Sequence, residues 1–265
     1  MDLKRIDDHY LTKRLGDLHN QLPTRIWGAA VNSSYFRVRV DPSNKPETVD
    51  ELKAPPPECV IGYQRCNRPN NPMFYASSSP KVALSEVNPQ VDQKIYLTQW
   101  KVRERFPVNH SLNLRLYDPN TFISNGEEFF SKYFRKKFSE RIEDSFSYKY
   151  KLTAGISNLL SANYPKSPNL DINKDGLVGL VYPSIQDSTK DNLALHPEMV
   201  ERCLGIECIV EATVLSIKKG IFRIRSDDIS RAVSLTNIKW EGVKGFMPIS
   251  WNLVQPTNST DEYEL

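Results

Sequence analysis

The sequence predicts an α+β protein with a mixed β-sheet. Short segments rich in β-branched and aromatic residues occur toward both ends of the chain, and two long amphipathic helical segments lie between them. A regular alternation of strands and helices is missing, and this order is typical of α+β proteins. With 265 residues, 39% of them apolar and 25% charged, the chain is long enough to bury a sizeable core.

The first hundred residues begin with apolar side chains at helical spacing, which predict a helix over 2–22. Three prolines in "KAPPPE" (53–58) predict a loop, because proline lacks a backbone donor. Ser79 is a suitable cap, and Pro80 is tolerated in a first turn, so "SPKVALSEV" (79–87) predicts a second helix. The strand segments here are "SSYFRVRV" (33–40), "PMFYASS" (72–78) and "QKIYLTQWKV" (93–102).

The remainder of the chain predicts helices and then strands. Aromatic residues along one side predict a helix over 124–146, and a second helix follows over 149–165, ending near Pro165. "DGLVGLVYPS" (175–184) predicts a strand. A hairpin is expected over 208–225 with Gly220 at its turn, and 238–251 has weaker strand signals.

Neither repeats nor a flexible linker divide this sequence. We therefore expect an N-terminal helical segment (1–34), one domain over 35–255 whose last part is a C-terminal extension, and a loose polar tail (256–265).

Composition and motifs exclude several classes of protein. A net charge of +3 is well short of a nucleic-acid-binding tail, and we expect no nucleic acid and no membrane partner. The N-terminus lacks the apolar centre of a signal peptide, so we expect a cytoplasmic protein. We expect no metal: the cysteines form no CxxC pair, and "DINKDGLVGLVY" (171–182) has Tyr182 where a calcium loop needs glutamate.

Four segments, in order, resemble the RES domain, a family named for its arginine, glutamate and serine. They are "YFRVRV", "APPPE", "RCNRPNNPMFYASSSPKVALSEV" and "GLVYPSIQDSTKDNLAL", and the resemblance runs from about Tyr35 to Leu215. This family is similar in fold to ADP-ribosyltransferase toxins. Its known members bind and break down NAD⁺, usually as the toxin of a toxin–antitoxin pair. The resemblance thus implies an ADP-ribosyltransferase-like core, NAD⁺ as substrate with no separate cofactor, and an antitoxin protein as partner.

The resemblance also implies site residues. The family's catalytic arginine, tyrosine and glutamate fall on Arg65, Tyr75 and Glu86. Its substrate-binding positions fall on Arg37, Arg39, Asn67, Ser184 and Asn192. The chain departs from the family pattern at Gln64, where a glycine is usual, and within "NNPM", where a later glycine is replaced.

These residue types suit NAD⁺ chemically. Arginine offers a planar, permanently charged fork for a pyrophosphate, and Arg65 and Arg37 are the candidates for this role. The ring of Tyr75 can stack on a flat base. A carboxylate can stabilise the cationic ribose carbon that forms as nicotinamide leaves, which is the role expected of Glu86. Water or phosphate would attack that carbon.

Other interpretations stay open on the residues alone. An isolated arginine or glutamate is usually a solvated surface residue, Tyr75 could belong to the core, and Ser184 could cap a turn. The chain could instead transfer ADP-ribose to a macromolecule, or bind a nucleotide or partner without turnover.

Overall fold

The computed structural model of the chain describes residues 3–19, 26–40, 44–112, 125–140, 142–162, 177–187, 189–233, 236–248, 251 and 261–265. The chain divides into two compact units, each built from three separate segments. Unit 1 comprises Met1–Ala30, Ala54–Tyr75 and Glu104–Cys203, and unit 2 comprises Val31–Lys53, Ala76–Arg103 and Leu204–Leu265.

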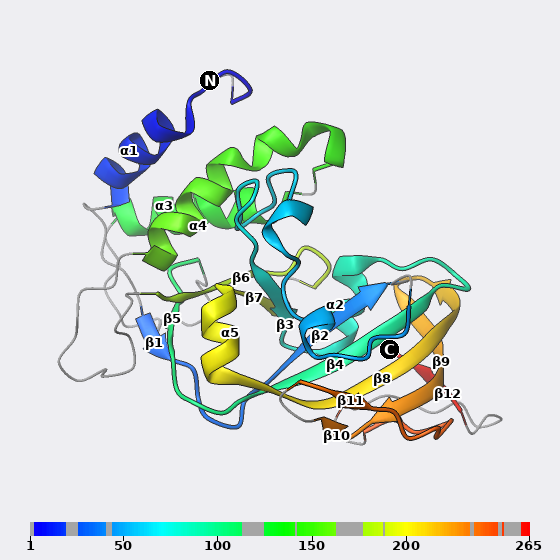
Figure 1. Cartoon of the computed structure of the whole chain (residues 1–265). Coiled ribbons are helices and arrows are strands. Elements are labelled where there is room, and N and C mark those ends of the chain that lie inside the picture. The colour runs from blue at the N-terminus through cyan, green and yellow to red at the C-terminus, as the bar shows by residue number, and fades with distance from the viewer. Residues whose placement is uncertain are drawn as a thin grey trace. The chain divides into compact units, whose positions relative to one another are not determined.

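Unit 1 combines most of the helices with short strands (Figure 1). Its helices are α1 (Asp8–His19), α3 (Asn125–Phe138), α4 (Lys151–Ala162) and α5 (Pro197–Cys203), with 3₁₀ turns η2 (Pro57–Cys59) and η4 (Asp144–Tyr150). Its strands are β1 (Ile26–Gly28), β5 (Pro107–Asn109), β6 (Gly179–Pro183) and β7 (Asp191–Leu195), which lie in the order β1-β5-β6-β7. The β5–β6 pair is parallel, whereas β1–β5 and β6–β7 are antiparallel.

Unit 2 is dominated by antiparallel strands. They are β2 (Ser34–Val40), β4 (Lys94–Val102), β8 (Leu204–Lys218), β9 (Ile221–Ser230) and β12 (Glu262–Glu264), in the order β2-β4-β8-β9-β12. The unit also contains η1 (Asp50–Leu52), α2 (Pro80–Val87) and the short pair β10 (Ala232–Val233) and β11 (Ile238–Lys239). Strand β3 (Phe74–Ser77) begins in unit 1 and ends in unit 2. The predicted α+β class with a mixed sheet is confirmed.

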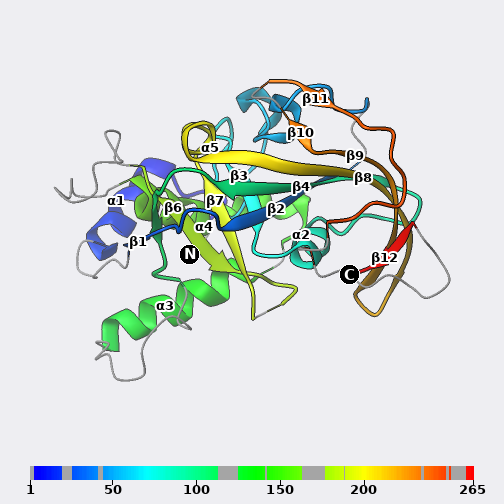
Figure 2. The same cartoon turned by 90° about the horizontal axis from the view of Figure 1, so that it is seen from below.

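Opposite faces of the unit 2 sheet carry different elements. Alternate residues of β2, including Phe36 and Val38, join a buried apolar cluster to which α2 contributes Ala83 and Leu84. In Figure 2, α2 lies below β4 and β8, whereas β10 and β11 lie above them. One face is therefore the apolar core, and the other is covered by the β10–β11 pair.

Locally encoded elements lie where the sequence predicts them. The α2 helix begins at Pro80, and the Ser79 hydroxyl accepts a hydrogen bond from the Val82 N–H at 3.3 Å, as expected for a cap. The β8–β9 hairpin turns at Lys219 and Gly220, which have φ angles of 51° and 76°. Such positive φ angles favour glycine.

The helix predicted over 124–146 is too long. Helix α3 ends at Phe138, and the Ser139 hydroxyl donates to the Arg135 carbonyl at 2.9 Å. This side-chain bond competes with continuation of the helix. Phe146 lies in the separate turn η4, although it shares the spacing of the α3 aromatic residues.

The end of the chain also differs from the expected loose tail. Glu262–Glu264 form β12, which pairs with β9, and Tyr263 and Leu265 are buried in the unit 2 core. Residues 256–260 and the calcium-like segment 171–176 lie outside the described residues.

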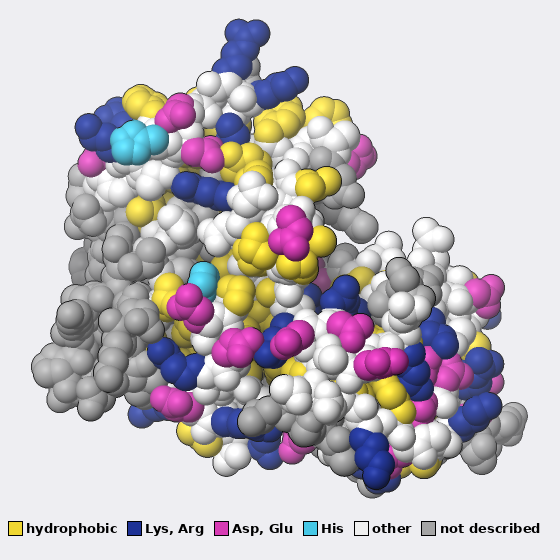
Figure 3. All heavy atoms as spheres, viewed as in Figure 1, with side chains coloured by type: hydrophobic (Ala, Val, Ile, Leu, Met, Phe, Trp, Pro, Cys, Tyr) yellow, Lys and Arg dark blue, Asp and Glu magenta, His cyan; other side chains and the backbone are white. Residues whose placement is uncertain are grey.

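Charges are mixed on the molecular face drawn in Figure 3. Lysine and arginine side chains alternate there with aspartate and glutamate, and no large patch of one sign forms on that face. Among the described residues, no helix is both long enough and apolar enough to cross a membrane.

Candidate active site

Arg65 lies on a loop of unit 1 that folds back on itself. The Asn70 N–H donates to the Val60 carbonyl at 2.8 Å, and the Gln64 N–H donates to the Asn67 carbonyl at 3.0 Å. Asn70 adopts a φ of 59°, a left-handed conformation that asparagine tolerates better than most residues. Gln64 does not have a positive φ. The loop thus forms without the glycines that the family pattern leads one to expect.

Tyr75, on β3, holds this loop from inside. Its hydroxyl accepts a hydrogen bond from the Cys66 N–H at 3.1 Å and donates one to Asn67 Oδ1 at 2.6 Å. Burial raises the pKa of Tyr75 well above its ordinary value, and the nearby Cys66 and Tyr182 act in the same direction. Tyr75 is therefore protonated at neutral pH and remains able to donate to Asn67.

Arg65 lies close to the groups that fix the loop. Its half-buried guanidinium favours ionisation of both Cys66 and Tyr75, so the positive charge is near the thiol and the phenol. The Asn67 amide also donates to the Arg68 carbonyl at 3.2 Å. Arg65, Asn67 and Tyr75 are thus brought together in unit 1.

Cys66 is a structural residue in this arrangement. It belongs to the buried apolar cluster of unit 1, which α1, α3 and α4 also supply. Burial raises the pKa of its thiol to about 12, although Ser157 and Arg65 beside it favour the thiolate. A thiol with this pKa is unsuited to be a nucleophile at neutral pH.

Ser184 and Asn192 are buried where β6 and β7 meet. The Ser184 hydroxyl accepts hydrogen bonds from the N–H groups of Gln186 and Asp187 at 3.1 and 3.3 Å, so it caps the turn that follows β6. Asn192 lies opposite Tyr182 across the β6–β7 pair. Tyr182 raises the pKa of Tyr75, so its phenol lies near the tyrosine that holds the Arg65 loop.

Arg37 and Arg39, in unit 2, hold a turn against β2. Arg37 donates from Nε to the Leu52 carbonyl and from Nη2 to the Lys53 carbonyl, both at 3.2 Å. Arg39 donates to the Glu51 carbonyl. These hydrogen bonds orient the two guanidinium groups, and Arg39 also acts electrostatically on the Glu51 carboxylate.

Glu86 is a half-buried residue in the last turn of α2, also in unit 2. Since α2 packs on the face of β2 that carries Phe36 and Val38, strand alternation directs Arg37 and Arg39 toward the other face. Within unit 2, the sheet therefore separates α2 from the two arginines.

A partly buried ionic cluster lies on the same side of unit 2 as η1, and no motif in the sequence indicates it. Lys45 Nζ lies 2.6 Å from both Glu211 Oε2 and Asp228 Oδ2, and Lys94 Nζ lies 2.6 Å from Glu211 Oε1. Burial alone would raise the pKa of Glu211, but the two lysines lower it below its ordinary value. The Lys45 ammonium also lies 4.0 Å from the Trp240 ring centre.

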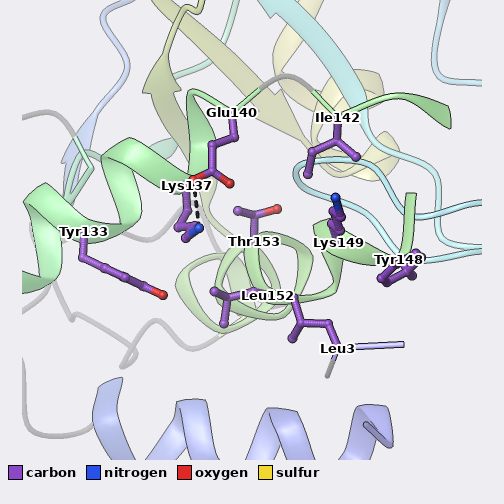
Figure 4. A pocket seen from close by; sticks show the side chains of 9 residues that line it. All are labelled: Leu3, Tyr133, Lys137, Glu140, Ile142, Tyr148, Lys149, Leu152 and Thr153. Atoms are coloured by element: carbon purple, nitrogen blue, oxygen red, sulfur yellow. Dashed lines mark hydrogen bonds and ion pairs between the residues drawn. The ribbon is translucent and has the colours of Figure 1, made fainter. Parts of the chain in front are cut away.

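A pocket of about 490 Å³ lies elsewhere in unit 1 (Figure 4). It is formed by the end of α3, by η4, by the start of α4 and by the N-terminal segment. Its lining residues are Leu3, Tyr133, Lys137, Glu140, Ile142, Tyr148, Lys149, Leu152 and Thr153. Lys137 and Glu140 form an ion pair at 2.8 Å within it, and the lining contains none of the predicted site residues.

No metal-binding cluster is found in the part of the chain that the structure describes. Three or more histidine, cysteine, aspartate or glutamate side chains do not converge anywhere among those residues.

The protein has an α+β fold. In unit 1, Arg65, Asn67 and Tyr75 lie together at one loop. The RES domain model matches residues 36–216, and the chain belongs to the RES domain family. A search of curated proteins found no match. The matched segment contains all eight predicted site residues, whereas α1, β10, β11 and β12 lie outside it.

Several residues that hold the site are not evident from the sequence. Tyr63 and Arg68 flank Arg65 and make the hydrogen bonds that tie the loop to α1. Tyr182 and Ser157 approach Tyr75 and Cys66 from distant segments. The sequence shows only that Tyr63 and Arg68 lie within three residues of Arg65. This closeness does not indicate that α1 is the element they bind.

Proposed function

We propose that this protein cleaves the bond between nicotinamide and ribose in NAD⁺. Membership of the RES domain family supports this proposal. The observation that carries it is the loop in which Arg65 lies beside Tyr75 and Asn67, since a permanently charged guanidinium on a fixed loop suits a pyrophosphate.

In this proposal each catalytic residue has a distinct task. Arg65 binds the pyrophosphate, and Tyr75 both holds the loop and offers its ring to a flat base. Glu86 stabilises the positive charge on the ribose carbon as the bond to nicotinamide breaks. Water then attacks that carbon and loses a proton, so the products are ADP-ribose, neutral nicotinamide and H⁺.

The proposed binding residues contribute to different degrees. Asn67 acts mainly on the loop, because its amide is engaged by Tyr75 and by the Arg68 carbonyl. Ser184 and Asn192 contribute hydrogen-bonding groups near Tyr182. We assign Arg37 and Arg39 a supporting role, since both hold the turn at residues 51–53.

We further propose that the protein acts as a toxin that is restrained by an antitoxin protein. An enzyme that depletes NAD⁺ would harm the cell that makes it, and the family resemblance supports such a partner.

Chromatography of the products tests the activity. Purified wild-type protein and Glu86→Gln are incubated with NAD⁺ labelled in the ADP-ribose part, with Glu58→Gln, an exposed glutamate of unit 1, as the matched control. We expect free ADP-ribose and nicotinamide from the wild type and the control, and a rate lower by about 10³-fold for Glu86→Gln. Intact NAD⁺ in every wild-type sample would contradict the proposal.

The same experiment separates the possible acceptors. Label on a macromolecule would indicate ADP-ribosyl transfer. A phosphorylated ADP-ribose that forms only in phosphate buffer would indicate phosphorolysis.

A further inference from the structure

We propose that α1 is a positioning element for the Arg65 loop. This inference rests on the proposed function, in which Arg65 binds the pyrophosphate of NAD⁺. Helix α1 precedes residue 36, where the family match begins, so the element that fixes the loop lies outside the matched segment.

Two hydrogen bonds join α1 to the loop, one on each side of Arg65. The Tyr63 hydroxyl donates to the Asp8 carboxylate, and Arg68 Nη2 donates to Thr12 Oγ1 at 2.6 Å. Asp8 and Thr12 are four residues apart and therefore lie on the same face of α1. One face of α1 therefore accepts hydrogen bonds from both loop residues that flank Arg65.

The donors and acceptors of these bonds are well defined. Thr12 Oγ1 donates its own hydrogen to the Asp8 carbonyl at 2.7 Å, which leaves its lone pairs for Arg68. Burial, together with the bond to Asp8, raises the pKa of Tyr63 to about 12. Tyr63 is therefore protonated at neutral pH and donates to Asp8.

Helix α1 is itself fixed to α4. Leu11 and Leu15 are buried between the helices, and a Cβ at Gly155 would lie only 2.9 Å from Leu15 Cδ1. Lys151 Nζ donates to the Ile6 carbonyl at 2.9 Å and lies 3.6 Å from the Asp8 carboxylate. Because α1 is fixed to α4 in this way, it can hold the Arg65 loop in place.

The loop is consequently held from two sides. Tyr75 binds its inner part through Cys66 and Asn67, whereas α1 binds its flanks through Tyr63 and Arg68. Loss of the α1 bonds should loosen the flanks while Tyr75 keeps the inner part, so substrate binding should suffer more than the chemical step.

A double variant, Thr12→Val with Tyr63→Phe, removes both bonds with little change in shape. The matched control is Tyr10→Phe, on the same helix, whose side chain is 55% exposed. Thr12→Ser keeps the hydroxyl and serves as the conservative variant. Two quantities are measured: hydrogen exchange of the backbone amides of 60–71, and KM and kcat for NAD⁺.

For the double variant we expect exchange over 60–71 to increase about tenfold and KM for NAD⁺ to rise about tenfold, with kcat changed less than about threefold. Tyr10→Phe and Thr12→Ser should behave like the wild type in both measurements.

The inference would be overturned if the amides of 60–71 exchanged at the same rate in the double variant as in the wild type, or if KM for NAD⁺ were unchanged. A loss confined to kcat would also contradict it. If the wild type leaves NAD⁺ intact, the proposed function fails, and the exchange comparison alone decides whether α1 holds the loop.

Discussion

The Arg65 loop of unit 1 and the Arg37–Arg39 strand of unit 2 hold their arginines by different means. In unit 1, a protonated phenol and an amide hold the loop within a largely apolar cluster. In unit 2, backbone carbonyls hold the guanidinium groups, and an ionic cluster lies on the same side of the sheet.

The two environments shift pKa values in opposite directions. Burial raises the pKa of Tyr75 and Cys66, so both stay protonated and act as neutral hydrogen-bonding groups. Lys45 and its neighbours outweigh burial at Glu211 and Asp228 and lower their pKa values, so both stay ionised. The inner part of the loop thus depends on packing around neutral groups, whereas the unit 2 face depends on charge.

Among the tests of this comparison, the largest effect is expected from breaking the Tyr75 contact. Tyr75→Phe keeps the ring but leaves the Cys66 N–H and Asn67 Oδ1 without this partner, and we expect it to lower kcat/KM about tenfold. Tyr75→Leu removes the ring as well and should lower kcat/KM about 100-fold or more. Steady-state kinetics with NAD⁺ measures both.

Equal losses in the two Tyr75 variants would mean that the hydroxyl alone matters and that the ring does not stack. Tyr133→Phe, on α3 of the same unit, is a suitable control because Tyr133 lines the separate pocket of Figure 4.

On the charged side of the comparison, Lys45→Met should destabilise the protein. The substitution leaves Asp228 and one oxygen of the buried Glu211 without their ammonium partner. Breaking a buried ion pair costs about 3–5 kcal/mol, and because Lys45 is 35% exposed we expect about 2 kcal/mol. Denaturant unfolding measures the loss, and Lys239→Met on β11 is the exposed control.

Wild-type stability in Lys45→Met would show that the cluster contributes nothing. A triple variant that also carries Glu211→Gln and Asp228→Asn should recover part of the loss, because no unpaired charge then remains.

A smaller loss of stability is expected when the pH is lowered. The pKa values of Glu211 and Asp228 are lower in the folded chain than their ordinary 4.5 and 3.8. The stabilisation is therefore present at neutral pH and is lost as pH falls below about 4.5. The free energy of unfolding measured from pH 7 to pH 3 should decline less steeply in Glu211→Gln/Asp228→Asn. Identical pH dependence in both proteins would contradict the assignment.

The smallest effect is expected from a thiol reagent, which should leave Cys66 unmodified in the native chain. Of the four cysteines, Cys59 is exposed, whereas the other three are buried and have raised pKa values. A thiol reagent should modify one cysteine per native chain, and Cys59→Ser should abolish this modification. Rapid labelling of Cys66, found by mass spectrometry, would show that the Arg65 loop opens readily.

Elements with local causes were predictable from the sequence. The start of α2 follows from Ser79 and Pro80, and the turn of the β8–β9 hairpin follows from Gly220, because these residues act within a few positions of themselves. The family was also predictable, through the order of motifs along the chain.

Features that depend on distant partners were not predictable. Strand β5 has three residues and exists because β1 and β6 pair with it, and β12 forms by pairing with β9. The α3 aromatic spacing continues past Phe138, so periodicity alone could not show that the helix ends at that residue. Nothing in the sequence indicated the division into two units, because each unit gathers three separate segments.

The most direct test of the central claim is a crystal structure of Glu86→Gln with bound NAD⁺. We predict that the pyrophosphate accepts hydrogen bonds from the Arg65 guanidinium while the carbon joined to nicotinamide lies beside residue 86. NAD⁺ bound at another place, or bound to Arg65 with that carbon away from residue 86, would contradict the account.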